Sequence, residues 1–202
     1  MGKLTNYERK IFAMKSLIEI IYNTQSTFQK LDTFNSNNLN LRSTLIFYTC
    51  GLVNGFHLFI TESNQLPTIS IWIVILYLLI FGLLNVIIGS YILSPFLFFI
   101  SKSLKGKSEF IDVKIVTAYS MIPSLIEIPI KIYKYSLSQN ELVDLNYTVL
   151  NIAYFLIWLL SIKILFQGIR YFNEFGIFKS LVNISPFVFI TIVFYLFFFS
   201  LL

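Results

Sequence analysis

The fold is decided by residues 69–100, which read ISIWIVILYLLIFGLLNVIIGSYILSPFLFFI without a single charged side chain. A helix of roughly 20 apolar residues is enough to cross ~30 Å of hydrocarbon. At the helical rise of 1.5 Å per residue this stretch would reach about 48 Å. It therefore predicts a transmembrane helix that is strongly tilted, protrudes into the cytoplasm, or kinks near Ser94-Pro95.

The composition of the whole chain agrees with a membrane protein. Of the 202 residues, 56% are hydrophobic and only 12% are charged, and the mean hydropathy is +0.76. A soluble domain would carry roughly twice that charged fraction. The formal net charge of +5 does not indicate a nucleic-acid binder, because the Lys and Arg residues mostly flank apolar runs. The expected partners are the lipid bilayer and its anionic headgroups.

Four further apolar runs predict spanning helices, so the expected fold class is an all-α bundle of five transmembrane helices. Ahead of them, residues 7–31 carry apolar groups at helical spacing with a basic opposite face. This pattern predicts a short amphipathic helix that lies on the membrane surface or packs on the cytoplasmic loops. We expect a cytoplasmic N-terminal segment over 1–42, with an Asn-rich linker at 32–38, and a transmembrane domain over 43–202. The other four helices are predicted over 43–60, 111–132, 149–169 and 181–202.

The distribution of Lys and Arg predicts the orientation. Six precede the first span and three follow the second, namely Lys102, Lys105 and Lys107, whereas only Lys131 and Lys134 occur between the third and fourth spans. Positive charge collects on the cytoplasmic side. The N-terminus is therefore expected in the cytoplasm, and five spans place Leu202 on the far side.

Two predicted helices carry features that suggest a packing or functional role. Gly51 and Gly55 form a small-xxx-small pattern, which lets two helix backbones approach closely within the chain or between chains, and Asn54 could hydrogen-bond across that contact. In the third helix, Pro123 and Pro129 flank Glu127. Each proline removes a backbone donor, so this helix should face the bundle interior.

Two alternatives remain open for the third helix. It is either a kinked packing element or the wall of a small polar pocket, formed by Ala118, Tyr119, Ser120 and Ser124. Glu127 lies four residues before Lys131, a spacing that favours an ion pair over a transport role. Lys163, in the fourth helix, is expected to extend its side chain toward the cytoplasmic interface.

No catalytic residue, metal site or cofactor is predicted. The sequence contains no His-Glu-x-x-His, Gly-x-Ser-x-Gly or Gly-rich phosphate motif. His57 is the single histidine, and it has no Cys, Asp or Glu at ligand spacing.

The order of these features resembles the Yip1 domain family. A loop over 102–110 containing Gly106 leads into a helix with Ala118-Tyr119 and Pro123, similar to the family's Ala-Tyr-x-x-x-Pro pattern. Further matches are Trp158, Gly168, Phe175-Gly176 and Lys179-Ser180-Leu181. The resemblance covers residues from about 20 to the end.

This resemblance implies a non-enzymatic protein that organises membrane or binds partner proteins, as a homo-oligomer or with other membrane proteins. Eukaryotic relatives are associated with Golgi and endoplasmic reticulum trafficking and with Rab-type GTPases. They carry a long cytoplasmic N-terminal region with an acidic, Tyr- and Pro-containing motif, which is missing here. The chain looks more like the compact prokaryotic members, which implies the cell (inner) membrane. The alternative function is a small transporter or a permease-like subunit, suggested by the proline-broken helix around Glu127.

Overall fold

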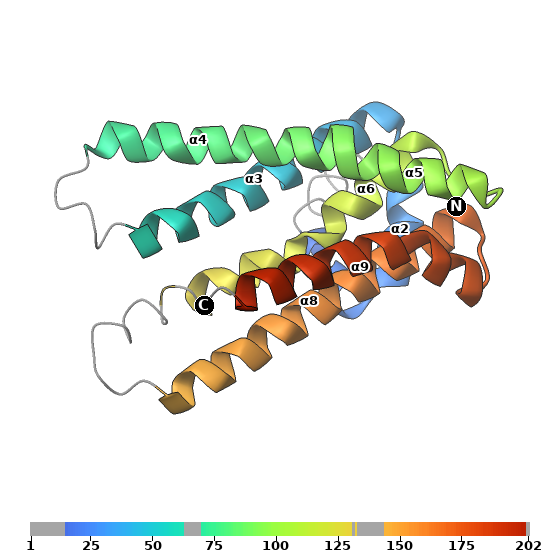
Figure 1. Cartoon of the computed structure of the whole chain (residues 1–202). Helices are drawn as coiled ribbons and strands as arrows, with labels where there is room; N and C mark the ends of the chain where they lie inside the picture. The colour runs from blue at the N-terminus through green and yellow to red at the C-terminus, as the bar shows by residue number, and fades with distance from the viewer. Residues whose placement is uncertain (1–14, 63–69, 131, 133–143, 201–202) are drawn as a thin grey trace.

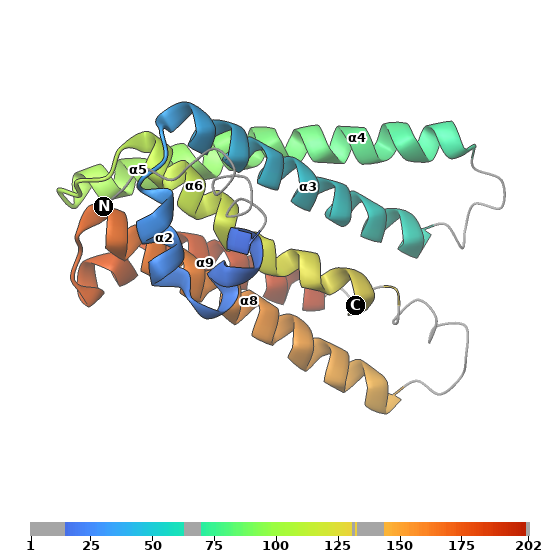
Figure 2. The ribbon, with the colours of Figure 1, turned by 180° about the vertical axis from the view of Figure 1, so that it is seen from behind.

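The computed structural model describes residues 15–62, 70–130, 132 and 144–200, and these residues contain helices and turns but no strand. Two pairs of long helices lie on either side of α6, as both views of the ribbon show (Figures 1 and 2). One pair is α3 with the α4–α5 segment, and the other is α8 with α9. The bounds are α3 Ser36–Glu62, α4 Ile71–Ile87, α5 Ser94–Ser103, α6 Phe110–Ser120, α8 Asp144–Asn173 and α9 Ile177–Ser200.

The predicted irregularity of the long second helix is present, as a π-helical turn rather than a break. The helical segment runs from Ile71 to Ser103 over 33 residues, with the π-helix η2 at Ile88–Leu93. Pro95 has no N–H group to donate to the carbonyl one turn earlier, and a π turn is one way a helix accommodates such a gap. The Ser94 hydroxyl donates to the Gly89 carbonyl at 2.6 Å and so helps to close this turn.

The third predicted helix is interrupted in the middle. α6 ends at Ser120, and a 3₁₀ helix, η3, follows at Ile122–Ile126. Pro123 lies in its first turn, where the missing N–H leaves a regular α-helix one bond short. The prediction of one continuous helix over 111–132 is therefore wrong. The expectation that this element faces the interior is confirmed for its first half, because every residue from 113 to 120 is buried, whereas Ile126 and Pro129 in its second half are exposed.

The N-terminal segment packs into the bundle. Helical residues 15–22 and α2 (Thr24–Leu31) are separated at Asn23, whose backbone is not helical. Ile20, Phe28 and Leu31 are all fully buried in the main core. The described part of the predicted helix over 7–31 therefore packs on α6 and α8 and is interrupted at Asn23.

The first long helix begins earlier than predicted. α3 starts at Ser36, so the segment over 32–38 is a short turn and not a full linker. The Asn35 side chain explains this start, since its carbonyl oxygen accepts the Asn38 N–H at 2.9 Å, which is the interaction of an N-cap residue.

Three described helical segments are long and apolar enough to cross a bilayer, namely Ile71–Ser103, Phe110–Ile130 and Val149–Asn173. The described apolar part of α9, Ile177–Val193, is shorter than a candidate membrane span. Within the described residues, α3 also does not meet the length and hydropathy required of a span. The structure thus shows an all-helical protein with three candidate spans. α8 extends beyond both ends of its predicted range, and α9 begins before residue 181.

Candidate functional site: two loops, two helix contacts and a pocket

A buried hydrogen-bond network joins the loop after α5 to the loop after α8. The Asn173 side chain accepts the Ser108 hydroxyl at 2.7 Å and donates to the Ile169 carbonyl at 3.0 Å and to Ser101 Oγ at 3.4 Å. The Asn183 amide reaches the same Ser101 oxygen at 2.9 Å. These four polar side chains are each no more than 2% exposed, so the network fixes α5, α8, α9 and the loop before α6 in one arrangement.

Both loops begin with the same helix-ending motif. Lys105 and Glu174 have φ of 63° and 52°, a left-handed conformation that most side chains avoid. After α5, the Gly106 N–H donates to the Ser101 carbonyl at 2.8 Å, and after α8 the Phe175 N–H donates to the Arg170 carbonyl at 3.1 Å. Together with the shorter bonds of Lys105 and Glu174, these form two Schellman motifs.

The two glycines predicted in these loops differ in their surroundings. A Cβ added to Gly106 would overlap the Asn173 carboxamide oxygen and lie 2.9 Å from Phe175 Cζ. Gly106 therefore allows the two loops to approach closely. A Cβ added to Gly176 would meet nothing within 4 Å, so Gly176 makes no comparable close contact in the described structure.

Exposed lysines surround this pair of loops. We call Lys102, Lys105, Lys107 and Lys179 the lysine surface; all four are exposed. Lys179 donates to the Leu104 carbonyl at 3.4 Å, and Lys107 pairs with Glu174 at 2.5 Å. The lysine surface is consequently built on a fixed backbone and carries more positive than negative charge.

Gly51 and Gly55 lie in the contact between α3 and α4. A Cβ at Gly51 would be 2.6 Å from the Phe81 carbonyl oxygen, and one at Gly55 would be 2.8 Å from Phe81 Cβ. The two glycines thus serve a helix contact within the chain. The hydrogen bond across it comes from Asn85, whose amide donates to the Phe47 carbonyl at 2.5 Å, and not from Asn54, which is exposed.

Tyr119 lies in a second contact, between α6 and the N-terminal segment. It is buried, as is its neighbour Ala118, and the Tyr119 hydroxyl is 2.9 Å from Ser16 Oγ. Gly168 completes this contact from α8, because a Cβ there would be 2.6 Å from Val116 and 2.8 Å from Phe28. Tyr119 and Gly168 thus lie where the N-terminal segment packs against the bundle.

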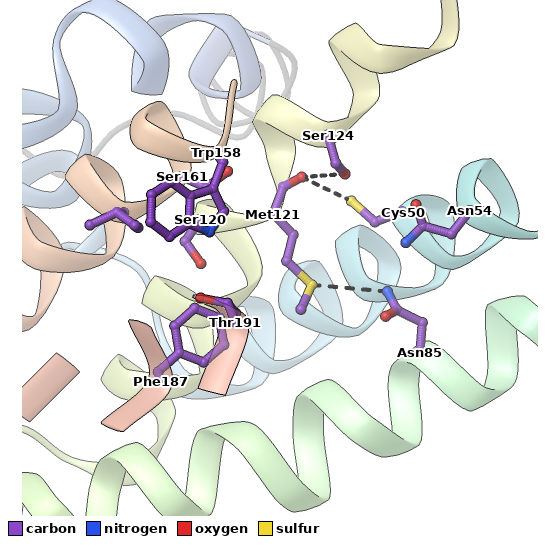
Figure 3. Close-up of a pocket in the computed structure, with 11 residues that line it drawn as sticks. Cys50, Asn54, Asn85, Ser120, Met121, Ser124, Trp158, Ser161, Phe187 and Thr191 are labelled. Atoms are coloured by element: carbon purple, nitrogen blue, oxygen red, sulfur yellow. Dashed lines mark hydrogen bonds between the residues drawn. The ribbon is translucent and has the colours of Figure 1, made fainter. Parts of the chain in front are cut away.

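A pocket of about 180 Å³ lies beside the interruption of α6 (Figure 3). Ser120, Met121 and Ser124 form the wall at the interruption. The Met121 carbonyl accepts the Ser124 hydroxyl at 2.7 Å and the Cys50 thiol at 3.5 Å. The other lining residues come from four helices: Cys50, Asn54, Asn85, Trp158, Ser161, Ile162, Phe187 and Thr191.

The pocket contains only part of the predicted set. Ser120 and Ser124 line it, whereas Ala118 and Tyr119 do not. Glu127 follows directly after η3 and is half-buried. Its predicted partner Lys131 lies outside the described residues.

The sequence interpretation missed a buried cation. Lys114 in α6 is 8% exposed, and its ammonium group donates to Asn40 Oδ1 at 2.6 Å and to Thr44 Oγ1 at 3.4 Å. The available signal was its place four residues into an apolar helix. Lys163 is exposed and donates to the Ile21 carbonyl at 3.4 Å, so it binds the N-terminal segment as well as reaching outward.

No group of three or more His, Cys, Asp or Glu residues that could hold a metal ion occurs within the described ranges. A search of curated proteins and of solved structures finds no match. The family model for the Yip1 domain matches residues 18–199, nearly the whole chain. This match includes the loop network, the pocket and both helix contacts except Ser16. The chain is an integral membrane protein and belongs to the Yip1 domain family.

Proposed function

We propose that this protein is a non-enzymatic membrane scaffold that holds partner proteins through the lysine surface. The observation that carries the proposal is the buried Asn173 network, which fixes two loops far apart in sequence as one surface. A surface that is already ordered loses little conformational freedom on binding. Its positive charge favours a partner with an acidic surface and also suits anionic headgroups nearby.

The proposed topology has five spans, with the lysine surface in the cytoplasm. α3 and α9 have 27 and 24 residues, which correspond to about 40 and 36 Å of helix and are long enough to cross. Lysine-rich loops favour the cytoplasmic side, and we expect the membrane to be a prokaryotic cell membrane. Single cysteines at positions 105 and 139 in a Cys50→Ser background, labelled in intact cells with an impermeant thiol reagent, test this. Labelling at 105 but not at 139 would invert the orientation.

The scaffold function is tested by purifying the tagged protein from its own membrane in nanodiscs and identifying the proteins that accompany it by mass spectrometry. Lys105→Glu should reduce recovery of the partner severalfold, because it reverses a charge on the lysine surface. Lys15→Glu makes the same charge change on an exposed residue in the N-terminal segment and should leave recovery unchanged. Equal recovery with both variants would count against the lysine surface as the docking site.

A second candidate function is a small transporter, favoured by the pocket at the interruption of α6 with Glu127 just beyond it. Interrupted helices and charged residues at membrane depth are common in transport sites. Glu127→Gln should then abolish solute uptake into proteoliposomes. Uptake that depends on Glu127 would overturn the scaffold proposal, whereas the scaffold function predicts no such dependence.

A further inference from the structure

We propose that the pocket beside Met121 binds a small, lipid-soluble alcohol, with the ligand's hydroxyl as the hydrogen-bond donor. This site is separate from the lysine surface and does not depend on the scaffold function. The proposal rests on two observations: the hydroxyl and thiol groups of the pocket wall already donate hydrogen bonds to backbone carbonyls, and the pocket is small and lies deep along the helices (Figure 3).

The hydroxyl protons of the wall all point to backbone carbonyls. Ser120 donates to Thr117 at 2.7 Å, Ser161 to Ile157 at 3.2 Å and Thr191 to Val188 at 2.8 Å, and Ser124 donates to Met121. A hydroxyl group has one proton but two lone pairs. Each of these oxygens can therefore still accept a hydrogen bond, but none has a proton left to donate.

On the opposite wall, formed by α3 and α4, the protons of Cys50 and Asn85 are also directed at atoms of the protein. The Cys50 thiol proton is directed at the Met121 carbonyl, and the Asn85 amide is directed at the Phe47 carbonyl and at Met121 Sδ, 4.0 Å away. The Asn85 carbonyl oxygen remains as an acceptor. Asn54, which can both donate and accept, is exposed. The hydroxyl and thiol groups of the wall thus offer acceptors, while its donors are the Trp158 indole N–H and the Asn54 amide. An alcohol hydroxyl can donate to those acceptors.

Size and depth narrow the class of ligand. A cavity of about 150 Å³ in another protein binds benzene, so the pocket of about 180 Å³ suits a molecule of similar size. Cys50 lies about 21 Å along α3 from Ser36, and Trp158 about 22 Å along α8 from Asn173. At that depth the ligand must enter from the hydrocarbon, where an alcohol hydroxyl has no partner and gains one on entering the pocket.

The two tryptophans of the chain provide the readout. Trp158 lines the pocket, whereas Trp72 is 74% exposed on α4. The full chain is placed in nanodiscs as Trp72→Phe, which keeps Trp158, and as Trp158→Phe, which keeps Trp72. Each is titrated with tribromoethanol, a small alcohol whose bromine atoms quench tryptophan fluorescence on contact, and with bromoform, which has no hydroxyl.

We expect tribromoethanol to quench Trp158 with a saturating curve and Trp72 with a linear one, as for simple partition into lipid. Bromoform should need a roughly fivefold higher concentration in the membrane for the same quenching of Trp158, the effect of one neutral hydrogen bond. A linear curve for Trp158, or equal half-saturation by both compounds, would overturn the proposal.

Two variants with the Trp72→Phe change locate the site. Ser161→Leu fills the pocket and should remove saturation, while Ser185→Leu, the same change at an exposed position of α9, should keep it. Thr191→Val removes an acceptor with little change of shape and should weaken binding of the alcohol severalfold but not of bromoform. Saturation that is unchanged in both Ser161→Leu and Thr191→Val would place the alcohol elsewhere and refute the assignment.

Discussion

Replacing Gly106 by Ala tests whether the two loops of the lysine surface are held by close packing. The backbone of Gly106 is not left-handed, so alanine meets no conformational penalty there. Its methyl group, however, would occupy the position of the Asn173 carboxamide oxygen and lie 2.9 Å from Phe175 Cζ. Asn173 must therefore move, and its bonds to Ser108 and Ser101 lengthen or break.

The cost of Gly106→Ala follows from those two bonds. A buried polar group that loses its partner costs about 1 to 3 kcal/mol, and forcing an extra methyl group into a packed region costs about 1 to 3 kcal/mol on its own. Because the terms overlap, and because a Gly to Ala change recovers about 0.4 to 1 kcal/mol through the unfolded state, we expect a net loss of about 2 kcal/mol. Gly176→Ala, where a Cβ meets nothing within 4 Å, is the matched control and should be neutral or slightly stabilising.

The measurement is the free energy of unfolding of the full chain in mixed micelles, titrated with a denaturing detergent. Asn173→Ala is measured alone and with Gly106→Ala, because removing the carboxamide removes the main clash. The cost of Gly106→Ala should then fall by about half or more, a coupling typical of residues in contact. The reasoning is refuted if Gly106→Ala is as mild as Gly176→Ala, or if its cost is the same with and without Asn173.

Three further outcomes can be measured in the same assay. Gly51→Ala places a methyl carbon 2.6 Å from a backbone oxygen of α4 and should cost about 1 to 3 kcal/mol; no loss would mean that the two helices can separate freely. Tyr119→Phe removes the bond to Ser16 and should cost about 1 kcal/mol and speed proteolysis of the N-terminal segment. The hydrogen bond from Lys30 holds the pKa of the Glu19 carboxyl below its usual 4.5. The Glu19–Lys30 pair therefore stabilises the folded protein above pH 4.5, and this contribution is lost as the pH falls through the lowered pKa of Glu19. Glu19→Gln should remove this pH dependence of the free energy of unfolding.

The positions of the long helices could be predicted from the sequence because they depend on apolar content alone. The apolar run over 69–100 gave the position of the long α4–α5 segment. The site of its irregular turn was predictable because Pro95 has no N–H group. The start of α3 was missed because residues 36–42 are mostly polar, and their two leucines, Leu39 and Leu41, are too few to give a helical apolar pattern. The break at Asn23 was missed for a related reason, since helical spacing continues across it.

The candidate site depended more on tertiary contacts. Ser120 and Ser124 were predicted to line a pocket, but the spacing of two serines does not reveal that other helices supply Trp158 and Thr191. The loop network was invisible for the same reason, because Asn173 becomes important only through Ser108, far away in the chain.

Lys114 and Lys163 show the limit most directly. Both are single lysines inside apolar helices, and the same argument about a long side chain reaching the interface applies to each. α6 lies between the two helix pairs, so Lys114 is largely surrounded by protein, and its ammonium group donates to Asn40 and Thr44. α8 lies at the edge of the bundle, and Lys163 stays exposed. The place of the helix in the bundle thus decides whether its lysine is buried or reaches the interface. The sequence feature that indicates an interior place for α6 is Pro123, just after its end, because an interrupted helix must be covered by protein.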